Sequence, residues 1–343
     1  MSGENSVVIS SRVRLARNLD GLPFPHKLRY EQGMIISKQV YEALAPIGSF
    51  NLYRMASSNE LDLDVLKEKH LISDDLLRSV GGAVVINDSE TVSVMVNEED
   101  HIREQCIMRG MKLEEAYREI DKADDAISSK MKFAYDDKLG YLTCCPTNVG
   151  TGMRASVMLF LPALALTDSI KSCVDAVSRL NMTVRGVYGE GSRADGFIYQ
   201  VSNSKTLGIS EREIISSVSN CIGRVIESEL IARDRLLQQS GVEIKDRVCR
   251  AWGLLTNAYS MSTDEFMSQL AYVKLGASEG YDLIKINDPD RFEKLFTEAQ
   301  PANVVNISGK ALDGDLASVT PAQRDVLRAA YVAKTLKAIA SRV

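Results

Sequence analysis

Pairs of short β-rich runs, each joined by a polar turn, constrain the fold of this chain more than any other feature. Residues 83–87 and 92–97 flank the turn Asn87-Asp88-Ser89-Glu90, and residues 182–188 and 196–202 flank a glycine-containing turn. Runs rich in β-branched residues that are separated by a few turn residues are typical of β-hairpins. A sheet of hairpin-linked strands is therefore predicted. Further strands are predicted at 7–17 and 140–146, and helices at 26–44 and 113–133.

The character of the sequence changes after about residue 210. Ser210-Glu-Arg-Glu213 has the spacing of a capping box and precedes a helical pattern that runs to about residue 239. Ser262-Thr-Asp-Glu265 and Thr320-Pro-Ala-Gln323 repeat the pattern, the second with proline in the first helical position. From residue 244 onward the sequence predicts helices alone. The expected fold class is α+β, with a catalytic domain at 1–235 and an all-helical domain at 236–343.

Composition excludes several classes of protein. A net charge of −5 argues against a general nucleic-acid binder, which is usually basic. The sequence has no apolar run of about 18 residues and no signal-peptide pattern at its start, so no membrane span is expected. Three scattered histidines and the absence of C-x-x-C pairs argue against a zinc site, and we expect reduced thiols and a cytoplasmic location. The cysteines are Cys106, Cys144, Cys145, Cys173, Cys221 and Cys249.

Arginines interrupt segments that otherwise have the pattern of buried strands and turns. In the run Val7–Arg17, alternation places Arg12 and Arg14 on one face and Val13 on the other. Three more arginines lie at predicted strand ends or turns, namely Arg103, Arg154 and Arg185. Five guanidinium groups that converge from one sheet would bind a polyanion such as a nucleoside triphosphate. The alternative for each arginine alone is a weak surface ion pair.

The familiar nucleotide-binding motifs are absent from the sequence. It contains no G-x-x-x-x-G-K-[ST] sequence, which excludes a Walker-type ATPase. It also lacks the H-R-D-L and D-F-G motifs of protein kinases. If the chain binds ATP, arginines are therefore expected to hold the phosphates.

Carboxylates close to these arginines indicate a cationic acceptor. Glu98, Glu99 and Asp100 follow a predicted strand, and Glu190 lies between two glycines. A guanidinium group pairs with carboxylates in bidentate fashion, and it is a poor nucleophile that needs orientation and a base. The alternative is an acidic turn on a solvated surface. Cys145, which precedes a proline, is either a small buried side chain or a thiolate near the acceptor.

Three long motifs in the same order resemble the catalytic domain of the phosphagen (guanidino) kinases. They are Ser10–Asn18, Asn97–Arg103 and Thr143–Ser156, and the resemblance covers roughly residues 7–230. It implies an antiparallel sheet flanked by helices, ATP with Mg²⁺, Glu99 as the catalytic base, Glu190 as the second guanidinium-binding carboxylate, and Cys145 as the active-site cysteine. The ATP-binding residues that it implies are Ser10, Ser11, Arg12, Val13, Arg14, His70, Arg103, Arg154, Ala155, Ser156, Val157, Met158, Arg185, Gly186, Val187, Tyr188, Gly189 and Glu190.

Two departures from the small-molecule kinases of this family point to a protein substrate. Those enzymes carry a helical domain before the catalytic domain, whereas here the first motif begins at Ser10, so the site is expected to be open enough for a protein side chain. The segment Arg324–Ala329 resembles the RDXXRA motif of bacterial protein-arginine kinases, and it implies that Arg324, Asp325, Arg328 and Ala329 form an allosteric phosphoarginine site. Arg193 is a departure from the same resemblance, which implies an acidic residue at this position.

The resemblance therefore implies a kinase of protein arginine that marks proteins for a Clp-type unfoldase–protease in the stress response. It further implies regulation by phosphoarginine, a zinc-containing McsA-like activator and a homodimer, without nucleic-acid or membrane partners. Two alternatives remain at this point. The first is a metabolic kinase of free arginine or a related small guanidine, and the second is a phosphoarginine-binding adaptor without activity.

Overall fold

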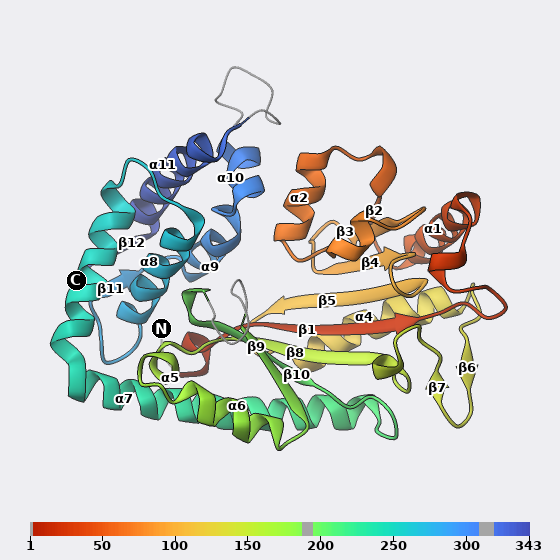
Figure 1. The fold of residues 1–343 in the computed structure, drawn as a ribbon, viewed down its shortest axis with the longest axis horizontal. Coiled ribbons are helices and arrows are strands. Elements are labelled where there is room, and N and C mark those ends of the chain that lie inside the picture. Colours follow the sequence, from red (N-terminus) through yellow and green to blue (C-terminus); the bar gives the residue numbers. More distant parts are fainter. Residues whose placement is uncertain (1–2, 187–194, 309–318) are drawn as a thin grey trace.

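The computed structural model describes residues 3–186, 195–308 and 319–343, and its centre is an eight-stranded antiparallel sheet (Figure 1). The strand order is β2-β3-β4-β5-β1-β8-β10-β9, so the first strand lies in the middle. The strands are β1 (Val8–Arg17), β2 (Phe50–Arg54), β3 (Ala83–Asn87), β4 (Val92–Val96), β5 (Ile102–Arg109), β8 (Met153–Phe160), β9 (Met182–Gly186) and β10 (Ile198–Asn203).

The two faces of the sheet differ in chemistry because side chains alternate along each strand. On β1, Val13 and Leu15 are buried in the main core, which the helices α4 (Leu113–Ser128) and α7 (Glu211–Asn257) cover. Arg12 and Arg14 lie on the opposite face, as the alternation in the sequence predicts. The shorter helices before α7 are α1 (Tyr30–Leu44), α2 (Glu60–Glu68), α3 (Asp74–Leu77), α5 (Pro162–Leu166) and α6 (Ile170–Ser178).

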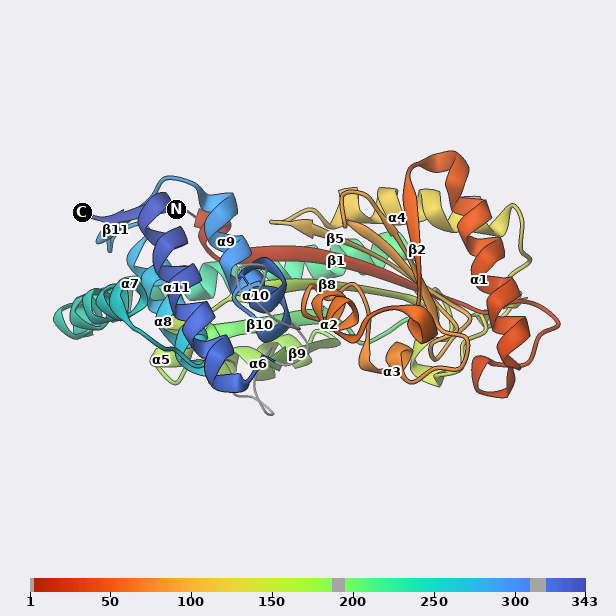
Figure 2. The same cartoon turned by 90° about the horizontal axis from the view of Figure 1, so that it is seen from above.

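The helical C-terminal region lies beside one end of the sheet, the end where both termini are found (Figures 1 and 2). Helix α7 belongs to both regions, because this 47-residue helix runs without a break through the predicted boundary at 235/236. It is kinked at Ser240. Its first turn has the predicted capping box between Ser210 and Glu213. The remaining elements are α8 (Thr263–Gly276), α9 (Pro289–Glu298), α10 (Pro301–Ser308), α11 (Pro321–Ile339), β11 (Ile284–Ile286) and β12 (Ala340–Arg342).

Three secondary-structure predictions need correction. The C-terminal region is not helical throughout, because β11 and β12 pair as a small antiparallel sheet. The predicted buried strand at 140–146 is only the two-residue β7 (Gly140–Tyr141), half-buried and paired with β6 (Tyr135–Asp136). The predicted helix at 113–133 ends at Ser128. Within the described ranges no helix is both long and apolar enough to cross a membrane.

Candidate active site

Five arginines from four strands lie on the sheet face opposite the core. Arg14 on β1 lies directly opposite Arg154 on β8. Arg103 on β5 lies opposite Ala16, which is two residues after Arg14 on β1 and therefore on the same face. Arg185 on β9 pairs with Gln200 on β10, which in turn lies opposite Met158. Since opposite residues of antiparallel strands share a face, this register gathers the guanidinium groups together. Arg103 and Arg154 are the second residues of β5 and β8, and Arg185 is the last but one residue of β9, so these three lie near strand ends as predicted. Arg12 and Arg14 lie in the middle of β1.

Four of these arginines surround a cavity of about 180 Å³, here called the arginine cavity. Its lining consists of Arg12, Arg14, Arg154, Ser156, Arg185 and Gln200. Among the described residues, none of these four arginines forms an ion pair with a carboxylate. Like charges without counter-ions are costly, so the cavity is suited to a multiply charged anion.

The pKa shifts express the same crowding. Burial, together with the charges of Arg103 and Arg154, lowers the pKa of Arg12 to about 10. Burial, together with Arg103, Arg12 and Arg154, lowers the pKa of Arg14 to about 9. Burial and the charges of Arg185 and Arg103 also lower the pKa of Arg154. A bound polyphosphate would reverse the electrostatic part of these shifts because its charge favours the guanidinium form.

The acidic loop after β4 presents one carboxylate and buries another. Asn97 has a positive φ of 60°, and its amide donates to the carbonyl oxygens of Gly33 and Gly81 at 3.1 and 3.0 Å, which fixes the loop. Glu98 is buried and pairs with Arg103. Glu99 is 37% exposed in its side chain and accepts from Arg103 at 3.2 Å. Partial burial raises the pKa of Glu99, which makes this carboxylate a stronger base.

Cys145 is connected to this acidic loop through the neighbouring residue, Cys144. Asp100 is buried and accepts from the backbone N–H of Cys144 at 2.7 Å and from the amide of Asn18 at 2.6 Å. The Cys145 thiol is half-buried and lies 3.1 Å from the hydroxyl of Thr147. Asp100 therefore connects the loop that carries Glu99 to the segment that carries Cys145.

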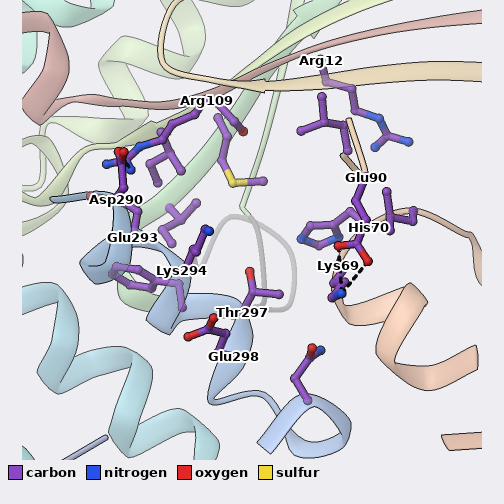
Figure 3. A pocket seen from close by; sticks show the side chains of 18 of the residues that line it. Arg12, Lys69, His70, Glu90, Arg109, Asp290, Glu293, Lys294, Thr297 and Glu298 are labelled. Atoms are coloured by element: carbon purple, nitrogen blue, oxygen red, sulfur yellow. Dashed lines mark hydrogen bonds and ion pairs between the residues drawn. The ribbon is translucent and has the colours of Figure 1, made fainter. Parts of the chain in front are cut away.

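A larger cavity of about 660 Å³, here called the interdomain cavity, adjoins the arginine cavity and shares Arg12, Ser156 and Gln200 with it. Figure 3 shows Arg12, Glu90 and His70 on one side and the α9 side chains Lys294 and Thr297 on another. Burial and the charge of Arg12 lower the pKa of His70 to about 4, so its imidazole is neutral near pH 7. Such a volume is typical of a small-molecule pocket.

The structure separates the predicted nucleotide-binding residues into three groups. The first group lies on the sheet face that carries the arginines, here called the site face, and lines one or both cavities or lies beside them. The side chains of the second group point into the core on the opposite face. The second group is Ser11, Val13, Ala155 and Val157, which are buried on the core side. The predictions for Val187, Tyr188, Gly189, Glu190 and Arg193 lie outside the described residues, and Gly186 is the last residue of β9.

Three site-face side chains escaped the sequence analysis although strand alternation contains the signal for them. Gln105 lies two residues beyond Arg103 and accepts from Arg12. Ser202 accepts from Arg154 at 2.8 Å, and Gln200 donates to Ser156 at 2.9 Å. Gln105 and Ser202 therefore orient Arg12 and Arg154 without compensating their charge.

The C-terminal RDXXRA segment lies at the start of α11, where its two arginines differ in environment. Arg328 is 1% exposed and donates to the carbonyl oxygens of Ala299 and Met261 at 2.7 and 2.8 Å and to Asp325 at 2.5 Å. Arg324 is half-exposed, one helical turn earlier. Arg328 therefore joins α11 to the ends of two neighbouring segments, and Arg324 is the more accessible cation.

Comparison with known proteins agrees with this geometry. Residues 34–232 match the family described as ATP:guanido phosphotransferase, C-terminal catalytic domain. A solved lombricine kinase shares 25% identity with a TM-score of 0.60, over 66% of this chain and 67% of that chain. A solved taurocyamine kinase from Schistosoma mansoni shares 25% identity with a TM-score of 0.62, over 78% and 40%. Fold and sequence place the chain among the ATP:guanido phosphotransferases, which are ATP-dependent kinases.

The C-terminal region narrows this class. Residues 241–342 match the family described as protein-arginine kinase McsB C-terminal domain. A protein-arginine kinase from Caldanaerobacter subterraneus subsp. tengcongensis is 46% identical over 341 residues, which cover 97% of this chain and 98% of the relative. Another from Moorella thermoacetica is 45% identical over 96% of this chain and 94% of the relative. Within the guanido phosphotransferases, the chain belongs to the protein-arginine kinase family.

Proposed function

We propose that this enzyme transfers the γ-phosphoryl group of ATP to arginine side chains of proteins, with the transfer centred between the arginine cavity and Glu99. The observation that carries the proposal is the linear order along β1. The interdomain cavity lies beside Ser10 and Arg12, the arginine cavity beside Arg12 and Arg14, and Arg103 with Glu99 beyond them. Two residues along a strand advance about 6.6 Å, so the order matches nucleoside, polyphosphate and acceptor.

In the proposed reaction, a guanidinium nitrogen attacks the γ-phosphorus in line with the bond to the β-phosphate oxygen. The new N–P bond forms as that P–O bond breaks, ADP leaves, and Glu99 accepts the proton that the nitrogen loses. Arg14, Arg103 and Arg154 stabilise the charge that is spread over the transferring group. Arg103 also holds Glu99 at 3.2 Å, so that one guanidinium couples the base to the phosphates.

Mg²⁺ that accompanies ATP would neutralise part of the phosphate charge. The described lining of the arginine cavity consists of arginines, a serine and a glutamine, with no carboxylate. Phosphate oxygens and water would therefore hold the ion, as is common for Mg²⁺. The cavity residues bind and orient the remaining phosphate oxygens.

The base role of Glu99 predicts an acid limb in the pH profile. The raised pKa of Glu99 means that the carboxylate is lost by protonation at a higher pH than for an ordinary glutamate. kcat/KM for the protein substrate is expected to fall as the pH drops through that raised value. The measurement is kcat/KM from about pH 8 down to about pH 5, with Mg²⁺ in excess so that ATP stays complexed. A profile that is flat over this range would contradict the assignment.

We further propose that phosphoarginine binds the start of α11 and regulates the enzyme, with Arg324 as the ligand-binding cation and Asp325 and Arg328 as its support. The domain boundary is proposed within α7, near the Ser240 kink, since the two family matches end and begin on either side of it. The free cysteines among the described residues support a cytoplasmic enzyme. A McsA-like activator, a Clp-type unfoldase–protease and a homodimer complete the proposal.

The two arginines of this motif are predicted to respond differently to alanine substitution. Arg328→Ala leaves the carbonyl oxygens of Ala299 and Met261 buried without their donor and is expected to cost about 3 kcal/mol in the free energy of unfolding. Arg324→Ala is expected to keep the wild-type melting temperature and to remove the response to phosphoarginine. Thermal denaturation and kinase assays with added phosphoarginine measure both. Equal stability of the two variants would argue against the structural role of Arg328.

The experiment that tests the proposed function is incubation with Mg-ATP and an unfolded arginine-rich protein, followed by mass spectrometry at neutral pH. Acid-labile phosphate on arginine side chains is the expected result. ADP formation that depends on free arginine, without protein phosphate, would move the substrate to a small guanidine. ATP binding without either product would overturn the catalytic proposal.

A further inference from the structure

One wall of the interdomain cavity comes from the C-terminal region, through helix α9. The carboxylates on this wall each have a basic partner, so their charge is compensated. The pairs are Asp290 with Arg109, Glu293 with Lys274 at 2.7 Å, and Glu298 with Arg291 at 2.5 Å. Glu298 also accepts from Tyr331 at 2.7 Å. These pairs leave α9 without a free negative charge toward the cavity.

Two other α9 side chains point into the cavity (Figure 3). Lys294 and Thr297 are three residues apart and therefore lie on the same side of the helix. Lys294 is exposed, and it has no carboxylate partner within the described part of the chain. The wall therefore offers one ammonium group and one hydroxyl group, a combination that suits a phosphate and sugar hydroxyls.

We propose that ATP binds between the two domains, with Lys294 and Thr297 of α9 contacting its α-phosphate and ribose. The inference rests on the proposed function, because the arginine cavity must hold the polyphosphate. The two cavities share Arg12, Ser156 and Gln200, so a nucleoside attached to that polyphosphate enters the interdomain cavity. Apolar side chains from both domains, including Leu71, Met158 and Phe296, line the cavity and form the surface for the base.

A carboxylate of the catalytic domain holds this wall in place. Glu68, in the last turn of α2, accepts from the backbone N–H groups of Ala302 and Asn303 at 2.7 and 2.8 Å and from the Asn303 amide at 2.8 Å. These groups form the first turn of α10, where a negative charge is favourable. Glu68 precedes His70 by two residues, and α10 follows α9 directly. Glu68 is therefore a positioning residue that ties the α9 wall to the nucleotide pocket.

The decisive experiment compares ATP with inorganic pyrophosphate, which corresponds to the β- and γ-phosphates and lacks the α-phosphate and the nucleoside. In the double variant Lys294→Ala/Thr297→Val, the Kd for ATP is expected to rise roughly tenfold or more, the loss typical of a charge-assisted hydrogen bond. The Kd for pyrophosphate is expected to stay within about twofold of wild type, because the arginine cavity is intact. Lys245→Ala, an exposed lysine of helix α7 outside both cavities, is the matched control.

Each outcome decides between the two proposals. An unchanged Kd for ATP in the double variant overturns the inference and leaves the proposed function intact. An equal loss for ATP and pyrophosphate also overturns it, since α9 would then act through the arginine cavity. If wild-type protein binds neither ligand, the proposed function fails. Glu68→Gln, which keeps one acceptor, is expected to raise KM for ATP several-fold without lowering kcat, and a loss of kcat alone would contradict its positioning role.

Discussion

Replacement of Glu99 by glutamine is expected to lower kcat for phosphoryl transfer by about 10³-fold, a typical contribution of a general base. Glutamine keeps the size and the hydrogen-bonding shape of the side chain but cannot accept the proton that the acceptor nitrogen must lose. The Kd for ATP is expected to change less than about threefold, because among the described residues Arg103 alone connects Glu99 to the phosphate-binding arginines. Single-turnover kinetics together with equilibrium binding of ATP separate the two effects.

Glu243→Gln is the matched control for this experiment. Both glutamates pair with an arginine four residues further along the chain, Glu99 with Arg103 and Glu243 with Arg247. Glu243 lies on α7 and lines neither cavity. Wild-type kcat is therefore expected for Glu243→Gln. Residual activity above about a tenth of wild type in Glu99→Gln would assign the proton to another group.

The central strand and its two faces were predictable because alternation in Ser11–Leu15 is regular. The neighbouring strand β5 was not predicted, and Glu104 shows why. This carboxylate lies on the packed face, is fully buried, and burial raises its pKa, so the apolar pattern of the strand is broken at its centre. The pairs of β11 with β12 and of β1 with β8 join segments far apart in the sequence. Local periodicity carries no information about such pairing.

The sequence predicted that five arginines converge, but not how the strands bring them together. The sequence placed Arg103, Arg154 and Arg185 at strand ends or turns but did not show which strands are neighbours, and the register of β1 with β8 puts Arg14 directly opposite Arg154. That opposition depends on lateral strand order, which the sequence does not contain. The contribution of α9 was also hidden, since Lys294 and Thr297 belong to a helix that follows all eight strands of the main sheet in the sequence. Only docking of the C-terminal region brings them to the cavity.

Arg14→Met is expected to remove most activity and, at the same time, to stabilise the protein without ligand. Loss of a phosphate-binding arginine typically costs about 10³-fold in transfer rate. Yet burial, together with the charges of Arg103, Arg12 and Arg154, lowers the pKa of Arg14 to about 9, so its charge opposes folding until a polyanion binds. Removing that charge is expected to raise the melting temperature by about 2 °C. Thermal denaturation with and without ATP, beside initial-rate kinetics, tests both halves.

Arg17→Met provides the control on the same strand with the opposite sign. Arg17 lies on the packed face, pairs with Asp124 at 3.0 Å and lies 3.5 Å from the ring centre of Tyr141. Its loss leaves Asp124 without its cation in a largely buried position and is expected to cost about 3 kcal/mol. A lower melting temperature for Arg14→Met would mean that its charge is compensated, and the polyanion argument would fail. A higher melting temperature for Arg14→Met and a lower one for Arg17→Met would mean that the two faces of β1 differ in their effect on stability. Arg14 would destabilise the protein by repulsion that bound ATP relieves, whereas Arg17 would stabilise it through its ion pair.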